Sequence, residues 1–341
     1  MLDIQTKIKD KLETRRTPWG FIMLIILTFS VTSILGLIWN QEPPTFNVLD
    51  TTSQVLEKNQ IDKVTGSSTV AVILEISETL LGKNGGYLSN DIMPPGAWMD
   101  NIPNWEFGAL VQLRDITRTM RNNFSRSQSQ SIEDPALVAA ENQFYFDNKS
   151  WMLPATESEY RKGIQQMTSF LVRLSNKAET DAQFYARADN LGTWLSEVET
   201  RLGSLSQRLS ASVGKRQFNT SLAGDSAAQQ STDTSTEMQV KTPWLELDDI
   251  FYEARGTTWA LIHLLKAIEI DFKDVLEKKN ATISLKHIIR ELETTQEPFW
   301  SPIVLNGTGF GLVANHSLVM GSHISRANTA IIELRRLLED G

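Results

Sequence analysis

The sequence contains no cysteine among its 341 residues. This absence excludes disulfide cross-links, thiol catalysis and zinc sites built from cysteine. An excess of basic residues is also missing, because 33 lysines and arginines stand against 41 aspartates and glutamates and leave a net charge of −8. Nucleic-acid binding requires a basic surface, so the charge balance argues against a nucleic-acid partner.

The common catalytic and cofactor motifs are absent as well. The sequence has no Gly-x-x-x-x-Gly-Lys-Ser/Thr phosphate-binding loop, no His-Glu-x-x-His zinc motif and no Gly-x-Ser-x-Gly nucleophile turn. Of its four histidines, His316 and His323 are seven residues apart, which is too far for a metal-binding pair one helical turn apart. No catalytic, cofactor-binding or metal-binding residue is therefore assigned, and a non-enzymatic role is the preferred interpretation.

One long stretch lacks charge altogether, namely residues 19–39, WGFIMLIILTFSVTSILGLIW. A helix of this length spans about 30 Å, which is the thickness of the hydrocarbon core of a bilayer. Trp19 and Trp39 would then lie at the two membrane interfaces, where tryptophan is favoured. A cleaved signal peptide has a shorter apolar region and a small-x-small cleavage site, neither of which is present. The pattern therefore predicts an uncleaved transmembrane helix.

The flanks of this segment predict its orientation. No basic residue follows it until Lys58, whereas five precede it: Lys7, Lys9, Lys11, Arg15 and Arg16. Positive residues are retained in the cytoplasm, so residues 1–18 form a predicted cytoplasmic tail and the rest of the chain lies across the membrane. Residues 19–39 would contact the lipid bilayer, and in a bacterium the main domain would lie in the periplasm.

Beyond residue 65 the apolar residues repeat with helical spacing. Sustained steps of four and three residues, an average of 3.5, predict left-handed packing of helices against one another. The fold class is therefore all-α, a periplasmic antiparallel helical bundle with heptad-like packing. Such a seam could also pair with a second chain, so self-association stays open. The two clearest seams are Phe184, Ala188, Leu191, Leu195, Val198, Leu202, Leu205, Leu209 and Met320, Ile324, Ala327, Ile331, Leu334, Leu338.

Irregular stretches suggest how the domain is divided. Residues 40–65 begin with Pro43-Pro44 and are predicted to be a tether. Residues 215–242 are rich in serine, threonine and glutamine and are predicted to be a flexible linker. They would separate a first helical half, 66–214, from a second, 243–341. Whether the two halves share one core is left open.

Two groups of residues are candidates for binding a partner. The loop at residues 82–104 mixes turn residues with aromatics, and a long loop of that kind is usually ordered or functional. Tyr87 and Trp98, with Trp105 just after the loop, could supply the large contact area typical of interfaces, or they could close the end of the bundle. A basic stripe could meet an anionic partner or pair with carboxylates of the domain itself; it consists of Arg114, Arg118 and Arg121.

Several long stretches resemble an uncharacterised family of bacterial envelope proteins that occurs mainly in gammaproteobacteria and is catalogued as a domain of unknown function. The resemblance implies an inner-membrane protein with one N-terminal anchor, and it brings no ligand, reaction or catalytic residue. It rests on GGYLSNDIMPPGAWMDNIPNWEFGALVQLRD (85–115), NNFSRSQSQS (122–131), QFYARADNLGTWL (183–195), LGSLSQRLSASVG (202–214), DDIFYEARGTTWALIHLLKAI (248–268) and ANHSLVMGSHISRANTAIIELRRLL (314–338).

These features together predict a single-pass inner-membrane protein whose periplasmic domain binds or scaffolds another cell-envelope component without catalysis. The partner would be an envelope protein or a second copy of the chain. Two alternatives remain open. One is an envelope hydrolase or metal-dependent enzyme, and the other is a ligand-sensing bundle that works through a partner in the membrane, because a tail of 18 residues is too short to carry an output domain.

Overall fold

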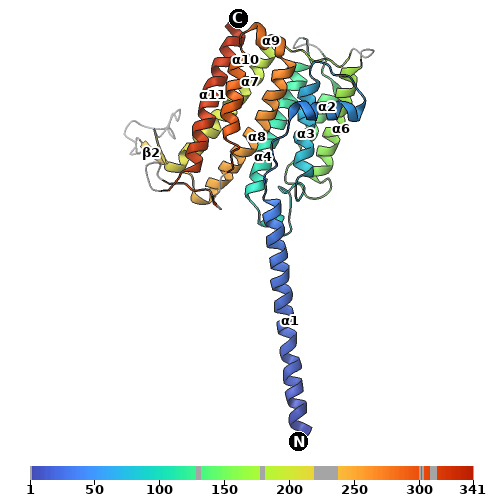
Figure 1. The fold of residues 1–341 in the computed structure, drawn as a ribbon, viewed down its shortest axis with the longest axis vertical. Helices are drawn as coiled ribbons and strands as arrows, with labels where there is room; N and C mark the ends of the chain where they lie inside the picture. Colours follow the sequence, from blue (N-terminus) through green and yellow to red (C-terminus); the bar gives the residue numbers. More distant parts are fainter. Residues whose placement is uncertain are drawn as a thin grey trace, which may run out of the picture.

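A computed structural model describes residues 2–127, 132–176, 181–218, 237–298, 301, 303–307 and 313–340, and for 2–18, 215–218, 237–240 and 340 it describes the backbone alone. One long helix projects from a helical domain, and the two chain ends lie at opposite ends of the molecule (Figure 1). Helices make up most of the regular structure, so the predicted all-helical class is confirmed.

The projecting helix is α1, Leu2–Trp39. Within the described part of the chain, its segment Trp19–Trp39 is the one stretch long and apolar enough to cross a membrane, and none of its central window is buried in the domain. The hydroxyl of Thr28 donates to the carbonyl of Leu24 at 2.9 Å, and that of Ser30 donates to Ile26 at 2.8 Å. The hydroxyls of Thr28 and Ser30 are thus satisfied within the helix, as an apolar environment requires.

The two tryptophans of this helix have different surroundings. Trp19 is exposed, as an interfacial residue would be. Trp39 is half-buried and packs against the domain, where its ring covers Gly85 so closely that a methyl group there would lie 2.7 Å from ring carbons. Trp39 therefore belongs to the contact between α1 and the domain.

The segment after α1 is ordered, so the prediction of a tether at residues 40–65 is wrong. It contains α2, Val48–Asn59, which packs on α3, Ser67–Gly82. Asn47 begins α2 as its N-cap, because its side-chain oxygen accepts from the N–H of Leu49 at 2.9 Å. Val48 and Leu56 are buried and hold the helix to the domain.

The rest of the domain consists of further helices and a few single turns, and two short strands pair beside them. Residues 219–236 of the predicted linker lie outside the described residues, and their flanks form the strand pair. The elements are α4 (Asn101–Thr119), η2 (Met120–Phe124), α5 (Pro135–Phe144), α6 (Thr156–Ser175), α7 (Ala188–Ser210), β1 (Lys215–Phe218), β2 (Glu237–Val240), α8 (Leu247–Asp271), α9 (Lys273–Lys278), α10 (Thr282–Thr294) and α11 (His316–Asp340), with 3-10 turns η1 (Gly96–Trp98), η3 (Ala211–Val213) and η4 (Trp244–Glu246).

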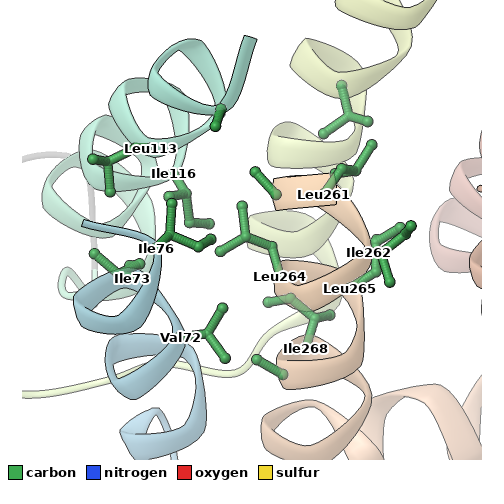
Figure 2. Close-up of a cluster of buried hydrophobic side chains, with 14 of the residues drawn as sticks. Val72, Ile73, Ile76, Leu113, Ile116, Leu261, Ile262, Leu264, Leu265 and Ile268 are labelled. Carbon is green, nitrogen blue, oxygen red and sulfur yellow. The ribbon is translucent and has the colours of Figure 1, made fainter. Parts of the chain in front are cut away.

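Helix α8 lies at the centre of the core. It contacts α3, α4 and α10, and its apolar side chains are buried around most of its circumference. Ile76 of α3, Ile116 of α4 and Leu264 of α8 point toward one another (Figure 2). A helix that is apolar on nearly every side is stable only when it is surrounded, so α8 organises the helices around it.

Glycines bring α4 and α8 unusually close. A methyl group at Gly256 would lie 1.9 Å from the carbonyl oxygen of Trp105, and one at Gly108 would lie 2.0 Å from that of Glu253. The two helices run in the same direction, because Asn104 bonds Asp249 near both starts and Phe124 meets Phe272 near both ends. This pair departs from the antiparallel order that the sequence predicts.

The predicted halves share one core. The apolar seam of α7, from the first half, packs against that of α11, from the second, and both are buried. Helices α4 and α8 also come from different halves, and residues of all four belong to one continuous apolar cluster. The two seams therefore find their partners within this chain.

Candidate functional site

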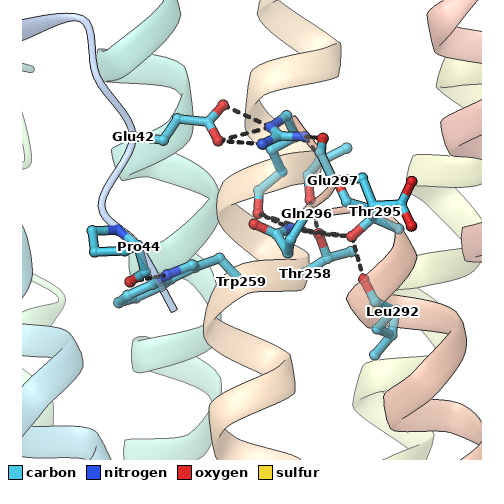
Figure 3. Close-up of polar contacts among 10 residues, drawn as sticks. Glu42, Pro44, Thr258, Trp259, Leu292, Thr295, Gln296 and Glu297 are labelled. Carbon is cyan, nitrogen blue, oxygen red and sulfur yellow. Dashed lines mark hydrogen bonds and ion pairs between the residues drawn. The ribbon is translucent and has the colours of Figure 1, made fainter. Parts of the chain in front are cut away.

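The connection between α1 and the domain is held by one face of α8. Arg255, Trp259 and His263 follow one another at intervals of four residues, so they lie on the same side of the helix. Each contacts the segment that leaves α1, at Glu42, Pro44 and Phe46. We call this set of contacts the junction, and Figure 3 shows the part of it at Glu42 and Pro44.

The first contact of the junction is an ion pair between the buried Arg255 and the half-buried Glu42. Arg255 Nε lies 2.7 and 2.8 Å from the two carboxylate oxygens of Glu42, and its Nη2 lies 2.7 Å from one of them. Arg255 Nη1 also donates to the carbonyls of Thr295 at 2.8 Å and Glu297 at 3.1 Å, just beyond α10. The guanidinium group thus joins the start of the domain to α8 and to the end of α10, with most of its donors satisfied.

A small network of neutral polar groups supports the same region. Thr295 Oγ1 donates to Thr258 Oγ1 at 2.8 Å, and Gln296 Nε2 donates to that same oxygen at 2.8 Å (Figure 3). Thr258 and Thr295 are buried, so these bonds replace the water that the hydroxyls have lost. The network holds in place the end of α10, where the carbonyls of Thr295 and Glu297 accept hydrogen bonds from Arg255.

The second and third contacts use aromatic rings. Trp259 Nε1 donates to the carbonyl of Pro44 at 3.2 Å. The N–H of Phe46 donates to His263 Nε2 at 2.9 Å, while His263 Nδ1 lies 2.7 Å from the carbonyl of Trp259. The rings of Phe46 and His263 stack with their centroids 3.8 Å apart. Nε2 can accept only in the neutral imidazole, so the junction requires an uncharged His263.

Burial lowers the pKa of His263 to about 4, because the charged ring would lose its hydration. The hydrogen bond between Nδ1 and the carbonyl of Trp259 opposes this shift without reversing it, and the charge of Lys266 adds to it. His263 is therefore neutral at physiological pH, in agreement with the geometry of its bonds.

A groove of about 750 Å³ borders the junction. Residues 45–49 form one of its walls, and α8, α9 and α10 form the other. Phe46, Val48 and Ile270 give it an apolar floor, while Lys273 and Lys286 lie at its rim. Each of these lysines has a glutamate within 4 Å, so the groove presents charges of both signs. Phe46 belongs to both features, so the groove and the junction share a residue.

The aromatic residues predicted to bind a partner are in different positions. Tyr87 and Trp105 are buried, so the prediction that they present contact area is wrong. Trp105 lies in the close contact of α4 with α8, and burial raises the pKa of Tyr87 beside Tyr160. Trp98 is 63% exposed and remains available at the surface.

The predicted basic stripe is engaged within the domain. Arg114 Nε donates to the carbonyl of Phe144 at 2.7 Å. Arg118 lies 3.0 Å from Glu197, and Arg121 lies 2.8 Å from Glu141. These contacts join α4 and η2 to α5 and α7. For Arg118 and Arg121 they are the pairing with carboxylates of the domain itself that the sequence analysis allowed, whereas Arg114 bonds backbone carbonyls.

Two buried carboxylates also have structural partners. Glu106 pairs with Lys83 and accepts from the N–H groups of Leu88 and Ser89, both at 2.8 Å, so it closes the loop that follows α3. Asp271 accepts from the N–H and hydroxyl of Thr69, both at 2.7 Å, at the start of α3. Burial raises the pKa of both carboxyl groups.

The histidines occupy separate places. His263 is in the junction, His316 Nδ1 accepts from the N–H of Leu305 at 3.0 Å, and His323 lies 3.3 Å from Glu291. Among the residues that the structure describes, no group of three histidine, aspartate or glutamate side chains could hold a metal ion.

Sequence reasoning missed the junction and the groove because residues 40–65 resembled a linker. Two signals were available. One is the asparagine at position 47, a residue type that often begins a helix, and the other is the set of three large side chains on one face of α8. Neither signal says that the two segments meet, because more than 210 residues separate them.

Comparison with known proteins gives one result that bears on identity. No curated protein and no solved structure matches the chain. A family model described as "Uncharacterized protein conserved in bacteria" (DUF2333) matches residues 12–341, which is nearly the whole sequence. The match confirms the resemblance that the sequence stretches indicated, and the chain therefore belongs to this bacterial family of uncharacterized proteins.

Proposed function

We propose that this protein is a single-pass inner-membrane protein whose helical domain lies in the periplasm and binds or scaffolds another cell-envelope component without catalysis. The apolar segment Trp19–Trp39 supports the anchor, and the basic residues that precede it support a cytoplasmic N-terminus. The acidic net charge fits a protein partner better than nucleic acid.

The observation that carries this proposal is the docked junction. Glu42, Pro44 and Phe46 are each bonded to α8, so the domain cannot swing freely about the end of α1. A membrane-anchored enzyme with a diffusing substrate gains little from such a fixed attachment. A scaffold needs it, because the height and orientation of the domain decide what it can hold.

Within this proposal the domain is a helical bundle in which part of the packing is antiparallel and heptad-like. The support comes from α7 and α11, where Glu199 pairs with Arg335, and Leu209 lies against Gly321. Residue numbers therefore increase along α7 in the direction in which they decrease along α11, which is the pattern of antiparallel packing. Both helices contribute an apolar seam of 3.5-residue spacing. Such a bundle offers rigid, extended faces to a partner.

The groove beside the junction is the proposed contact surface. It has a volume of about 750 Å³, is mixed in charge and is bordered by the exposed side chain of Leu49, which suits a helix or extended segment of another protein. Photo-crosslinking residues placed at Leu49 and at Lys273, on its two walls, would test this in living cells. We expect both positions to yield an adduct with the same envelope protein.

Two controls decide the outcome. The same crosslinker at Val172, an exposed position on α6, should not give that adduct. Leu49→Arg should abolish the adduct formed from position 273, since it places a long cation in the groove. If positions 49 and 273 give no common partner, or if position 172 gives it equally, the groove is not the contact surface.

Ligand sensing is a second candidate function, favoured by the shared position of Phe46. A small molecule in the groove would contact Phe46 and could alter the junction that fixes α1. Native mass spectrometry of protein purified from gently solubilised membranes separates the two functions. A bound small molecule that disappears in Leu49→Arg would favour sensing, whereas a bound protein would favour the scaffold.

A further inference from the structure

Two loops of the domain expose large apolar side chains next to α1. The first, residues 92–98, carries Ile92, Met93 and Trp98, and Met93 is 71% exposed. The second, residues 151–153, consists of three consecutive exposed side chains, of which Leu153 is 91% exposed. Clusters of exposed apolar residues usually mark a surface that binds a protein, a ligand or a membrane.

The first loop meets α1 inside the apolar segment. Its Trp98 ring lies 6.4 Å from the ring of Phe29, and a methyl group at Gly36 would lie 3.5 Å from Pro95. A helix rises about 1.5 Å per residue, so these contacts lie about 15 Å and 5 Å along the axis from Trp39 toward the N-terminus. A bilayer that covers residues 19–39 therefore reaches the level of this loop.

The second loop is attached to the first. Asn90 Nδ2 donates to the carbonyl of Ser150 and to the carboxylate of Glu157, both at 2.9 Å. The two apolar segments thus flank one contact point, on the end of the domain from which α1 leaves (Figure 1).

The first loop also suits an environment with little water. Its Ala97 N–H donates to the carbonyl of Met93 and its Trp98 N–H to that of Pro95, both at 3.0 Å, while Pro94 and Pro95 have no N–H to satisfy. Asp91 is the one charged residue between 85 and 99. The pairing of these two N–H groups and the absence of two others lower the penalty for moving this part of the loop out of water.

We propose that residues 92–98 and 151–153 form a second lipid-binding surface, which inserts its apolar side chains into the outer leaflet of the bilayer that α1 crosses. The inference rests on the membrane anchoring in the proposed function. The occupant is phospholipid, because the loops continue the apolar surface of α1 and tryptophan and leucine side chains favour the interface. Together with the junction, this surface sets the tilt of the domain.

The absence of native cysteine allows a direct test with the full-length chain in phospholipid nanodiscs. Met93→Cys and Leu153→Cys, each labelled with an environment-sensitive fluorophore, should show blue-shifted emission and quenching by spin-labelled lipids. Ile283→Cys, on an exposed site at the start of α10, is the control for a label in water. Ile25→Cys, in α1, is the control for a label in the bilayer.

The four labels separate the possible failures. If the label at 25 is quenched by lipid but those at 93 and 153 respond to aqueous iodide as the label at 283 does, the inference is overturned and the anchor stands. If the label at 25 is also accessible to iodide, the proposed membrane anchoring itself is wrong. Circular dichroism checks the fold of each variant; Leu153 touches little of the domain, so its label remains informative if that at 93 disturbs the loop.

Discussion

The contact of α7 with α11 and the contacts of α8 show two ways in which one domain joins its helices. The first is a seam of leucines, isoleucines and alanines at 3.5-residue spacing. Around α8, glycines let the backbone of α4 approach, and Arg255, Trp259 and His263 bind the segment from α1 through polar bonds. The seam supplies stability through apolar burial. The contacts of α8 instead fix the positions of α4 and of the segment that follows α1, and they tolerate little change in the side chains involved.

Removal of the Arg255 charge should have the largest effect on stability. Arg255→Met leaves the half-buried Glu42 without its partner. Breaking a buried ion pair from one side costs about 3–5 kcal/mol, and we expect the lower end because the Glu42 side chain is still 15% exposed. Chemical unfolding of the full chain in detergent should show this loss. Arg336→Met, which changes an exposed arginine on α11, is the control and should cost little. Equal losses in the two variants would contradict the role of the junction.

A methyl group between α4 and α8 should be nearly as damaging. In Gly256→Ala the new carbon would overlap the carbonyl of Trp105, and the helices must separate. Overpacking of this kind costs about 3 kcal/mol at the upper end of its usual range. The midpoint of chemical unfolding measures the loss. An unchanged midpoint would mean that the two helices lie farther apart than the structure shows.

Acid should weaken the junction by a smaller amount. The pKa of His263 is lowered to about 4 in the folded chain, from an ordinary value of 6.5, so the unfolded chain binds a proton first as the pH falls. The stabilisation is fully present above about pH 6.5 and is lost between pH 6.5 and 4, with about 2 kcal/mol gone by pH 5.

The variant His263→Gln isolates this effect. Glu106 and Asp271 also titrate with shifted pKa values, but they contribute equally to both chains. The difference in unfolding free energy between the native chain and the variant should therefore shrink as the pH falls from 7.5 to 5. A difference that stays constant over this range would show that His263 is not held neutral.

The smallest effect, and one of opposite sign, is expected on α7. A methyl group at Gly192 meets no atom within 4 Å, so Gly192→Ala should fit without strain. Replacing a helical glycine by alanine stabilises a protein by roughly 0.5–1 kcal/mol. An unfolding midpoint above that of the native chain would sharpen the contrast with Gly256. A destabilised variant would show that α7 tolerates change no better than α8 does.

The same contrast explains what could be predicted from the sequence. The 3.5-residue repeat identified both seams, because an apolar stripe must be buried whatever its partner is. The contacts of α8 could not be predicted this way, since glycine at 108 or 256 carries no periodic signal and Glu42 gives no hint of an arginine 213 residues away. The burial of Tyr87 and Trp105 could not be predicted either, because an aromatic residue in an irregular stretch can lie in the core or on the surface.

The central claim is that the junction fixes the domain on α1. Spin labels at Leu37→Cys, on α1, and at Ile283→Cys, at the far end of the domain, would measure this in the full-length chain by double electron–electron resonance. A docked junction predicts a single narrow distance distribution that broadens in Arg255→Met. A broad distribution in the native chain, unchanged by Arg255→Met, would show that residues 40–46 are a flexible tether and would contradict the account.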